Sequence, residues 1–264
     1  MKHFASPTPC PAGPVFPKPQ DPAAFAKAFE ARFRPSSLRV WEAFDEVLAL
    51  LFAGCLLLDP RAATEGLAES TARDAERAKA RLAKAGLLPA EVVALVESFV
   101  QAIAADGNDW LGRVAGLLCV LDGKGKGQFF TPPEVGSLMA ALVDGGAAPS
   151  EGLIRETVRK KGFIGVADPT AGSGGLLLSF VERVRATGLD PSLTVFVEAV
   201  DIDGAAARMA FVQLAIRDVP AKVICGDSLA LETRWEAFTP ITAARFIPHQ
   251  EERKRWKDLF ALVQ

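Results

Sequence analysis

The sequence predicts an α/β protein in which a helical region precedes a parallel sheet. Apolar runs at residues 163–168, 193–201 and 221–225 have the length of buried strands. Helix-like stretches at 175–187 and 204–217 separate them. Strands that alternate with helices in this way predict a parallel sheet with right-handed crossovers.

The stretch from Pro22 to about Leu121 has helical periodicity and no strand signal, so we expect a small helical domain. Ser36 or Ser37 is expected to cap a first helix whose apolar stripe runs from Leu38 onward. Pro89 opens another helix, as prolines at the first helical position commonly do. The later helices are expected at 64–85, 90–105 and 109–121.

We expect the chain to divide into three parts. Residues 1–21 are rich in proline, which favours extended, disordered chain. Residues 22–122 are the helical domain, and 123–264 are an α/β domain that begins with a Gly-Lys-Gly-Lys-Gly hinge. Near its end, 248–263 has the pattern of an amphipathic helix, with a basic run typical of a solvated face.

Composition narrows the function classes. Half of the 264 residues are hydrophobic, enough for a sizeable core, and the net charge of −2 provides no global basic field. Contact with DNA would therefore need a local patch or a partner. Cys10, Cys55, Cys119 and Cys225 lack CxxC spacing, so neither a metal site nor a disulfide framework is expected. The apolar run at 48–58 is too short to span a membrane, and we expect a cytoplasmic protein without a membrane partner.

The most informative segment is 166–175, Val-Ala-Asp-Pro-Thr-Ala-Gly-Ser-Gly-Gly. An acid at the tip of a buried strand, here Asp168, can hold a cationic amino group, while a glycine-rich loop lets a ligand lie close. The dinucleotide pattern Gly-x-Gly-x-x-Gly fits Gly172 and Gly174 but fails at Leu177. A glycine-rich turn with no ligand is the alternative.

An acid follows each of the three expected strands: Asp168, Asp201 and Asp227. Ligands of open parallel sheets bind outside the carboxyl ends of the strands, so these acids are expected to share one crevice. Asp201 can accept both hydroxyls of a ribose, Ile202 can pack on an adenine, and Asp227 can accept from an exocyclic amine. With an ammonium beside Asp168, this set predicts S-adenosylmethionine. Each acid alone also fits a helix cap or a turn.

The tetrapeptide Phe-Phe-Thr-Pro before the sheet adds another element. We expect Thr131 to be an N-cap, Pro132 to open a helix that runs to about Val143, and Glu134 to complete a capping box. Phe130 and this helix start could close over the methionine end of the cofactor. A hydrophobic staple beside a capping box is the alternative.

In this order, the segments resemble the adenine-N6 DNA methyltransferases, and most closely the modification subunit of type I restriction systems. The resemblance covers roughly residues 109–230 and lies in Asp109-x-Leu111-Gly112, Lys124-x-Lys126-Gly-Gln-Phe-Phe-Thr-Pro132, Asp168–Leu177, Asp201 and Gly226-Asp-Ser-Leu229. It implies a partial Rossmann-like S-adenosylmethionine-dependent methyltransferase fold preceded by a helical domain. It also implies that the cofactor is bound by Phe130, Thr131, Asp168, Pro169, Thr170, Gly172, Gly174, Asp201, Ile202, Asp227 and Ser228.

The catalytic segment of that family is missing. In the family, Asn or Asp, then Pro-Pro, then Tyr or Phe follows the fourth strand, where carbonyl oxygens accept the protons of the adenine amine and the aromatic stacks on the flipped base. At that place this chain has 236–242, Glu-Ala-Phe-Thr-Pro-Ile-Thr, and Pro132-Pro133 belongs to the Phe-Phe-Thr-Pro segment. We therefore predict no catalytic residue. With its end at Gln264, we expect a truncated methyltransferase-like sheet.

Three functions follow as hypotheses. The first is an S-adenosylmethionine-binding relative that is inactive alone, as a decoy, a regulator or one subunit of a restriction or anti-restriction system. Alternatively, it is an active DNA adenine-N6 methyltransferase completed by a partner chain, through which DNA is contacted. The third hypothesis is a structural module that has lost its ligand.

Overall fold

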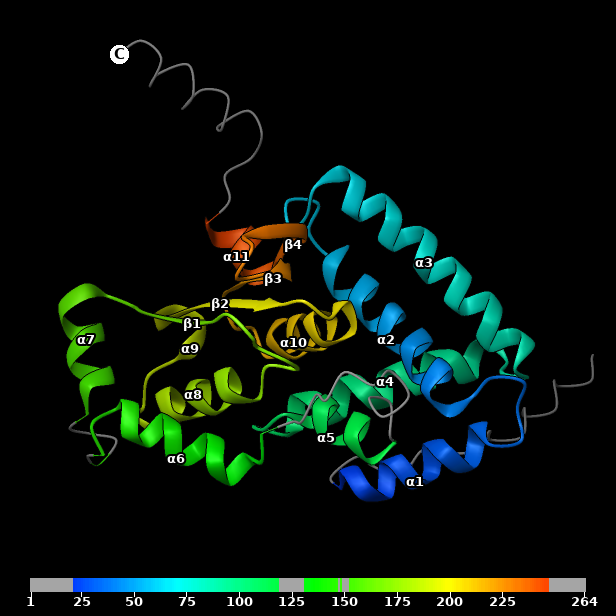
Figure 1. The fold of residues 1–264 in the computed structure, drawn as a ribbon, viewed down its shortest axis with the longest axis horizontal. Coiled ribbons are helices and arrows are strands. Elements are labelled where there is room, and N and C mark those ends of the chain that lie inside the picture. The colour runs from blue at the N-terminus through cyan, green and yellow to red at the C-terminus, as the bar shows by residue number, and fades with distance from the viewer. Residues whose placement is uncertain (1–20, 119–130, 147, 149–151, 247–264) are drawn as a thin grey trace, which may run out of the picture.

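A computed structural model describes residues 21–118, 131–146, 148 and 152–246 (Figure 1). A helical region lies on one side of a small sheet, and further helices pack along the sheet. The predicted mixed α/β architecture is confirmed. The proline-rich tail up to residue 20, the hinge at 123–127 and the expected helix at 248–263 lie outside the described residues.

An aromatic cluster holds the helical region together. The ring of Phe25 lies edge-on to those of Phe99 and Trp110, with centroids 4.8 Å apart in both pairs. Such pairs contribute about 0.5–1.5 kcal/mol each beyond the burial of their area. The helices of this region are α1 (Pro22–Phe33), α2 (Val40–Leu56), α3 (Glu65–Lys84), α4 (Pro89–Ala105) and α5 (Trp110–Leu117).

Two predicted helix starts are wrong. Helix α2 begins after Arg39, whose backbone N–H is accepted by the carboxylate of Glu42 at 3.0 Å, and neither Ser36 nor Ser37 caps it. Helix α6 (Pro133–Val143) begins after Pro132, without a side-chain cap from Thr131. A residue that precedes proline is forced into extended conformations, so the Pro-Pro pair moves the helix start by one residue.

The sheet has the order β1-β2-β3-β4. Strands β1 (Ile164–Asp168), β2 (Val195–Asp201) and β3 (Ala221–Asp227) are parallel, as the sequence predicts. Strand β4 (Glu232–Phe238) was not predicted, and it pairs antiparallel with β3. A Cβ on Gly226 would lie 2.1 Å from the carbonyl oxygen of Glu232, so the close approach of β4 requires glycine there.

Helices α8 (Gly175–Ala186) and α10 (Gly204–Ile216) connect the parallel strands and contact the buried face of the sheet. The opposite face carries apolar side chains that are only half-buried, Phe196, Val200 and Ile224. The remaining short helices are α7 (Leu153–Lys161), α9 (Pro191–Thr194) and α11 (Pro240–Phe246), none of which was predicted.

One hydrophobic core runs from the helical region into the sheet. Phe52 of α2 contacts Phe211 of α10, with ring centroids 5.0 Å apart, and Trp235 of β4, at 5.4 Å. The predicted boundary between residues 122 and 123 falls outside the described residues, so the division into domains stays a prediction.

Within the described residues, no single helix is long and apolar enough to cross a membrane, although the bent pair Gly66–Lys84 and Pro89–Ala105 meets the length and composition criteria together. The same part of the chain contains no cluster of three or more His, Cys, Asp or Glu residues suited to a metal ion.

Candidate cofactor site

Three acids lie at the carboxyl ends of the parallel strands, a side of the sheet that we call its carboxyl edge; the opposite side is its amino edge. Asp168, Asp201 and Asp227 are the last residues of β1, β2 and β3, which are neighbouring parallel strands. The carboxyl ends of parallel strands emerge at the same edge, where open α/β sheets bind their ligands. The structure therefore brings the three acids to one side of the molecule.

The glycine-rich loop between β1 and α8 crosses the end of β2. Ala171 donates its backbone N–H to the carbonyl of Val200 at 2.8 Å. Gly172 and Gly174 have φ angles of +57° and +93°, a left-handed backbone that glycine adopts most readily. A Cβ added to Gly172 would meet no atom within 4 Å. The bare backbone therefore faces open space in which a ligand can lie.

Asp201 fixes this loop in place. Its side chain is buried, and its two carboxylate oxygens accept the backbone N–H groups of Gly172 and Asp203, each at 2.7 Å. A carboxylate has about four lone-pair sites, so contacts to a ribose would use those that remain. The sequence predicted only the ribose contact and not this connection between strand end and loop.

The other two acids are more exposed. Asp168 accepts the backbone N–H of Thr170 at 2.9 Å, and Pro169 and Thr170 are exposed beside it. Asp227 accepts from the backbone N–H groups of Ala230 (3.0 Å) and Leu229 (2.9 Å), which lower the pKa of its carboxyl. Each of these acids thus shapes a turn.

Two further predicted residues lie beside these acids. Ile202 follows Asp201 with 56% of its surface exposed, while its carbonyl accepts from the guanidinium of Arg234. Ser228 is half-buried in the turn after β3. An exposed apolar side chain at the carboxyl edge of the sheet suits one face of a planar base.

The start of α6 lies beside the loop. A Cβ on Gly136 would be 2.3 Å from the hydroxyl of Ser179 and 3.8 Å from the carbonyl oxygen of Gly175, so α6 and the first turn of α8 are in close contact. Thr131 directly precedes this helix and is half-buried. Phe130 lies outside the described residues.

A buried polar network behind the loop was not predicted. The hydroxyl of Ser173 donates to the carboxylate of Asp109, which also accepts from the side-chain amide of Gln213 at 2.8 Å. Gln213 could have been recognised in the sequence as a buried polar residue, because it is the one polar side chain in the apolar run Phe-Val-Gln-Leu-Ala of α10.

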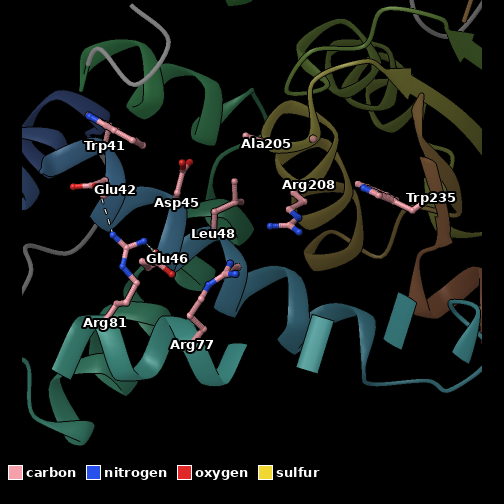
Figure 2. Close-up of a pocket in the computed structure, with 12 residues that line it drawn as sticks. Trp41, Glu42, Asp45, Glu46, Leu48, Arg77, Arg81, Ala205, Arg208 and Trp235 are labelled. Atoms are coloured by element: carbon pink, nitrogen blue, oxygen red, sulfur yellow. Dashed lines mark hydrogen bonds and ion pairs between the residues drawn. The ribbon is translucent and has the colours of Figure 1, made fainter. Parts of the chain in front are cut away.

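A pocket of about 400 Å³ lies apart from the acids, between α2, α3, the first turn of α10 and β4 (Figure 2). Its charged side chains are paired within the protein: Arg81 with Glu42 and Glu46, and Arg208 with Asp74. The pairs of Arg81 join α3 to α2, and the pair of Arg208 joins α10 to α3. The pocket contains none of the predicted site residues.

Residues 236–242, which stand where the related family has its catalytic segment, lie at the end of the sheet opposite to the three acids. Strand β4 runs antiparallel from Glu232, opposite Asp227, to Phe238, opposite Lys222 near the start of β3. Beyond it, the buried hydroxyls of Thr239 and Thr242 accept the backbone N–H of Ala221, at 3.0 and 2.8 Å. Residues 236–242 therefore stabilise the amino edge of the sheet.

A parallel sheet with a glycine-rich loop and acids at its carboxyl edge defines a Rossmann-like cofactor-binding protein. Residues 117–245 match the family model described as N-6 DNA Methylase. This match supports S-adenosylmethionine as the cofactor, as the sequence predicted.

One solved structure compared with the chain comes from Listeria monocytogenes, and it is described as a class I S-adenosylmethionine-dependent methyltransferase. It is 20% identical, with a TM-score of 0.36, and the match covers 72% of this chain and 55% of that one. The chain thus spans about half the length of this protein. No curated protein matches the chain.

The residues present fit this cofactor. The partly exposed carboxylate of Asp168 suits an ammonium group, the open space above Gly172 leaves room beside the loop, and Ile202 exposes an apolar surface. When bound, S-adenosylmethionine supplies an activated methyl group.

Proposed function

We propose that this chain binds S-adenosylmethionine at the carboxyl edge of β1–β3 and does not transfer the methyl group when it is alone. Asp168 would hold the ammonium of the methionine end, and Asp201 the ribose hydroxyls. Ile202 would pack on the adenine, whose exocyclic amine would donate to Asp227. A cytoplasmic location belongs to the same proposal.

The placement of 236–242 supports the inactive form. Transfer to adenine needs oxygen acceptors and an aromatic side chain around the flipped base, close to the cofactor. In this chain the corresponding segment, 236–242, forms the last residues of β4 and includes the buried Thr239 and Thr242 at the amino edge, whereas the three acids lie at the carboxyl edge. None of its side chains lies at the proposed cofactor site.

Titration calorimetry with S-adenosylmethionine and S-adenosylhomocysteine tests the binding. We expect saturable binding by the wild-type chain, and a large loss of affinity in Asp168→Ala. Asp190→Ala is the matched control, because Asp190 is also an acid that caps a turn, accepting from Ser192 at 2.9 Å, but it precedes β2. Absence of binding by the folded protein at millimolar ligand would contradict the proposal and favour a structural module.

The second candidate is a DNA adenine-N6 methyltransferase completed by a partner, such as another subunit of a restriction system. Within the described residues, β1 pairs only with β2, so one edge of β1 has no strand partner. A strand added parallel to this edge would end next to Asp168, beside the proposed cofactor. Helices of the same partner chain would cover Phe196, Val200 and Ile224 on the half-buried face of the sheet.

Transfer of tritiated methyl groups to DNA separates the two candidates. We expect no transfer by this chain alone, and transfer only with a neighbouring gene product would establish the second candidate. Transfer by the lone chain would disprove the inactive form. No transfer in any combination would reject the second candidate.

A further inference from the structure

The corner between α4 and α5 touches the cofactor loop from behind. Asp109, the N-cap of α5, is buried, and so are Ser173 of the loop and Gln213 of α10. These residues come from the helical region, the loop and a crossover helix. Their contacts join the helical region to the proposed cofactor site.

Every oxygen of the Asp109 carboxylate is used. One oxygen accepts the backbone N–H of Gly112 and the side-chain amide of Gln213, both at 2.8 Å, and the other accepts the hydroxyl of Ser173. Gln213 also donates to the carbonyl of Ser173 at 2.9 Å and accepts from Leu111 at 3.0 Å. Burying a carboxylate without donors is strongly unfavourable, so these groups are expected to order together.

The space around the network explains a glycine in the helical region. A Cβ on Gly112 would lie 2.1 Å from a carboxylate oxygen of Asp109 and 2.4 Å from the hydroxyl of Ser173. Any side chain at this position would push the carboxylate away from the loop. Gly112 and Asp109 therefore belong to the same contact with Ser173.

Arg217, the C-cap of α10, also holds this corner. Its guanidinium donates to the carbonyls of Ile103 (3.0 Å), Gly107 (3.3 Å) and Asn108 (2.5 Å), and its burial lowers the pKa to about 10. Gln213 and Arg217 are four residues apart, which places them on the same face of the helix. Helix α10 thus fixes the corner at two points.

We propose that Asp109 is a positioning residue of the cofactor site, which holds Ser173 and thereby keeps Gly172 and Gly174 in their ligand-ready backbone conformation. The helical region then sets the affinity for the cofactor without contacting it. The inference about affinity rests on the proposed function, whereas the inference about loop order does not.

The matched comparison is Asp109→Asn with Asp144→Asn. Asp144 is also buried and accepts from the backbone of Ile154 and the guanidinium of Arg183, each at 2.8 Å, but it lies at the end of α6 and contacts α7 and the last turn of α8 instead of the loop. Ser173→Ala removes only the hydroxyl that the loop donates to Asp109, and it replaces Asp109→Asn in the comparison if that variant does not fold. Hydrogen exchange of the loop peptide and calorimetric affinity are measured for each folded variant.

We expect faster exchange at 171–174 and about ten-fold weaker binding of S-adenosylmethionine in Asp109→Asn or Ser173→Ala, since hydrogen bonds to charged groups are of this order. Asp144→Asn should lower the melting temperature with both loop readouts unchanged. Unchanged exchange in the Asp109 and Ser173 variants would overturn the inference, as would equal effects of Asp144→Asn. If the wild type binds no cofactor, the proposed function fails, while exchange still decides the role of Asp109.

Discussion

The carboxylate of Asp201 accepts the backbone N–H of Gly172 at 2.7 Å, which joins the end of β2 to the loop that follows β1. The same carboxylate accepts from Asp203 at the start of the next helix. One side chain thus sets the relative positions of two segments of the proposed cofactor site.

Asp201→Ala should destabilise the protein by about 1–3 kcal/mol, because the buried N–H of Asp203 loses its acceptor. Asp201→Asn keeps one side-chain oxygen as an acceptor and should therefore lower the free energy of unfolding by less. Urea unfolding of the two variants measures the free energies. Equal stability of Asp201→Ala and the wild type would show that the two backbone bonds contribute little.

Phe52→Ala should lower the free energy of unfolding by about 3–5 kcal/mol, because the ring fills the space between α2, α10 and β4. Since the core is continuous, loss of helix and loss of tertiary structure should coincide in a single transition. Circular dichroism follows the loss of helix, and tryptophan fluorescence follows the loss of tertiary structure. Separate transitions would instead support independent domains at 22–122 and 123–264.

Gly226→Ala should destabilise the chain by about 1–3 kcal/mol, because the new methyl group would collide with the backbone of Glu232. Gly54→Ala is the control, since Gly54 lies exposed in α2 with no atom within 4 Å of the new group. Alanine is the better helix former, so this control should gain about 0.5–1 kcal/mol. Thermal unfolding should show a lower melting temperature for Gly226→Ala and a higher one for Gly54→Ala.

Asp227 should make stability depend on pH at the acidic end. Its folded-state pKa lies below the ordinary 3.8, so its contribution is fully present above that value and is lost as the pH falls through the lowered pKa. The stability difference between the wild type and Asp227→Asn should therefore shrink below about pH 4. Chemical unfolding at several pH values measures it, and a constant difference would contradict the assignment.

The parallel strands could be predicted because their apolar runs are short and bounded by acids and glycines. Strand β4 could not, since Glu232, Thr233 and Arg234 are exposed polar side chains, and only the tight turn after Asp227 brings them against β3. Its pairing depends on the hairpin and not on an apolar pattern.

The acids of the candidate site were identifiable from their positions at strand ends, but their partners were not. Gln213 and Asp109 meet across 104 residues of sequence, and no local pattern encodes such a distance. The predicted N-cap at Thr131 was also wrong. The residue before a proline is restricted to extended conformations, so Pro132 precedes the helix, and this outweighed the capping-box motif.

In the described part of the chain, one edge of β1 has no strand partner, and this affects the tendency of the protein to aggregate. An edge of this kind is a template for strands of other molecules, and the half-buried Phe196, Val200 and Ile224 lie on the same sheet. The exposed Arg159, Lys160 and Lys161 in the last turn of α7, shortly before β1, carry positive charges that oppose the association of like molecules. Colloidal stability should therefore fall as added salt screens these charges, and aggregation should begin along this side of the sheet.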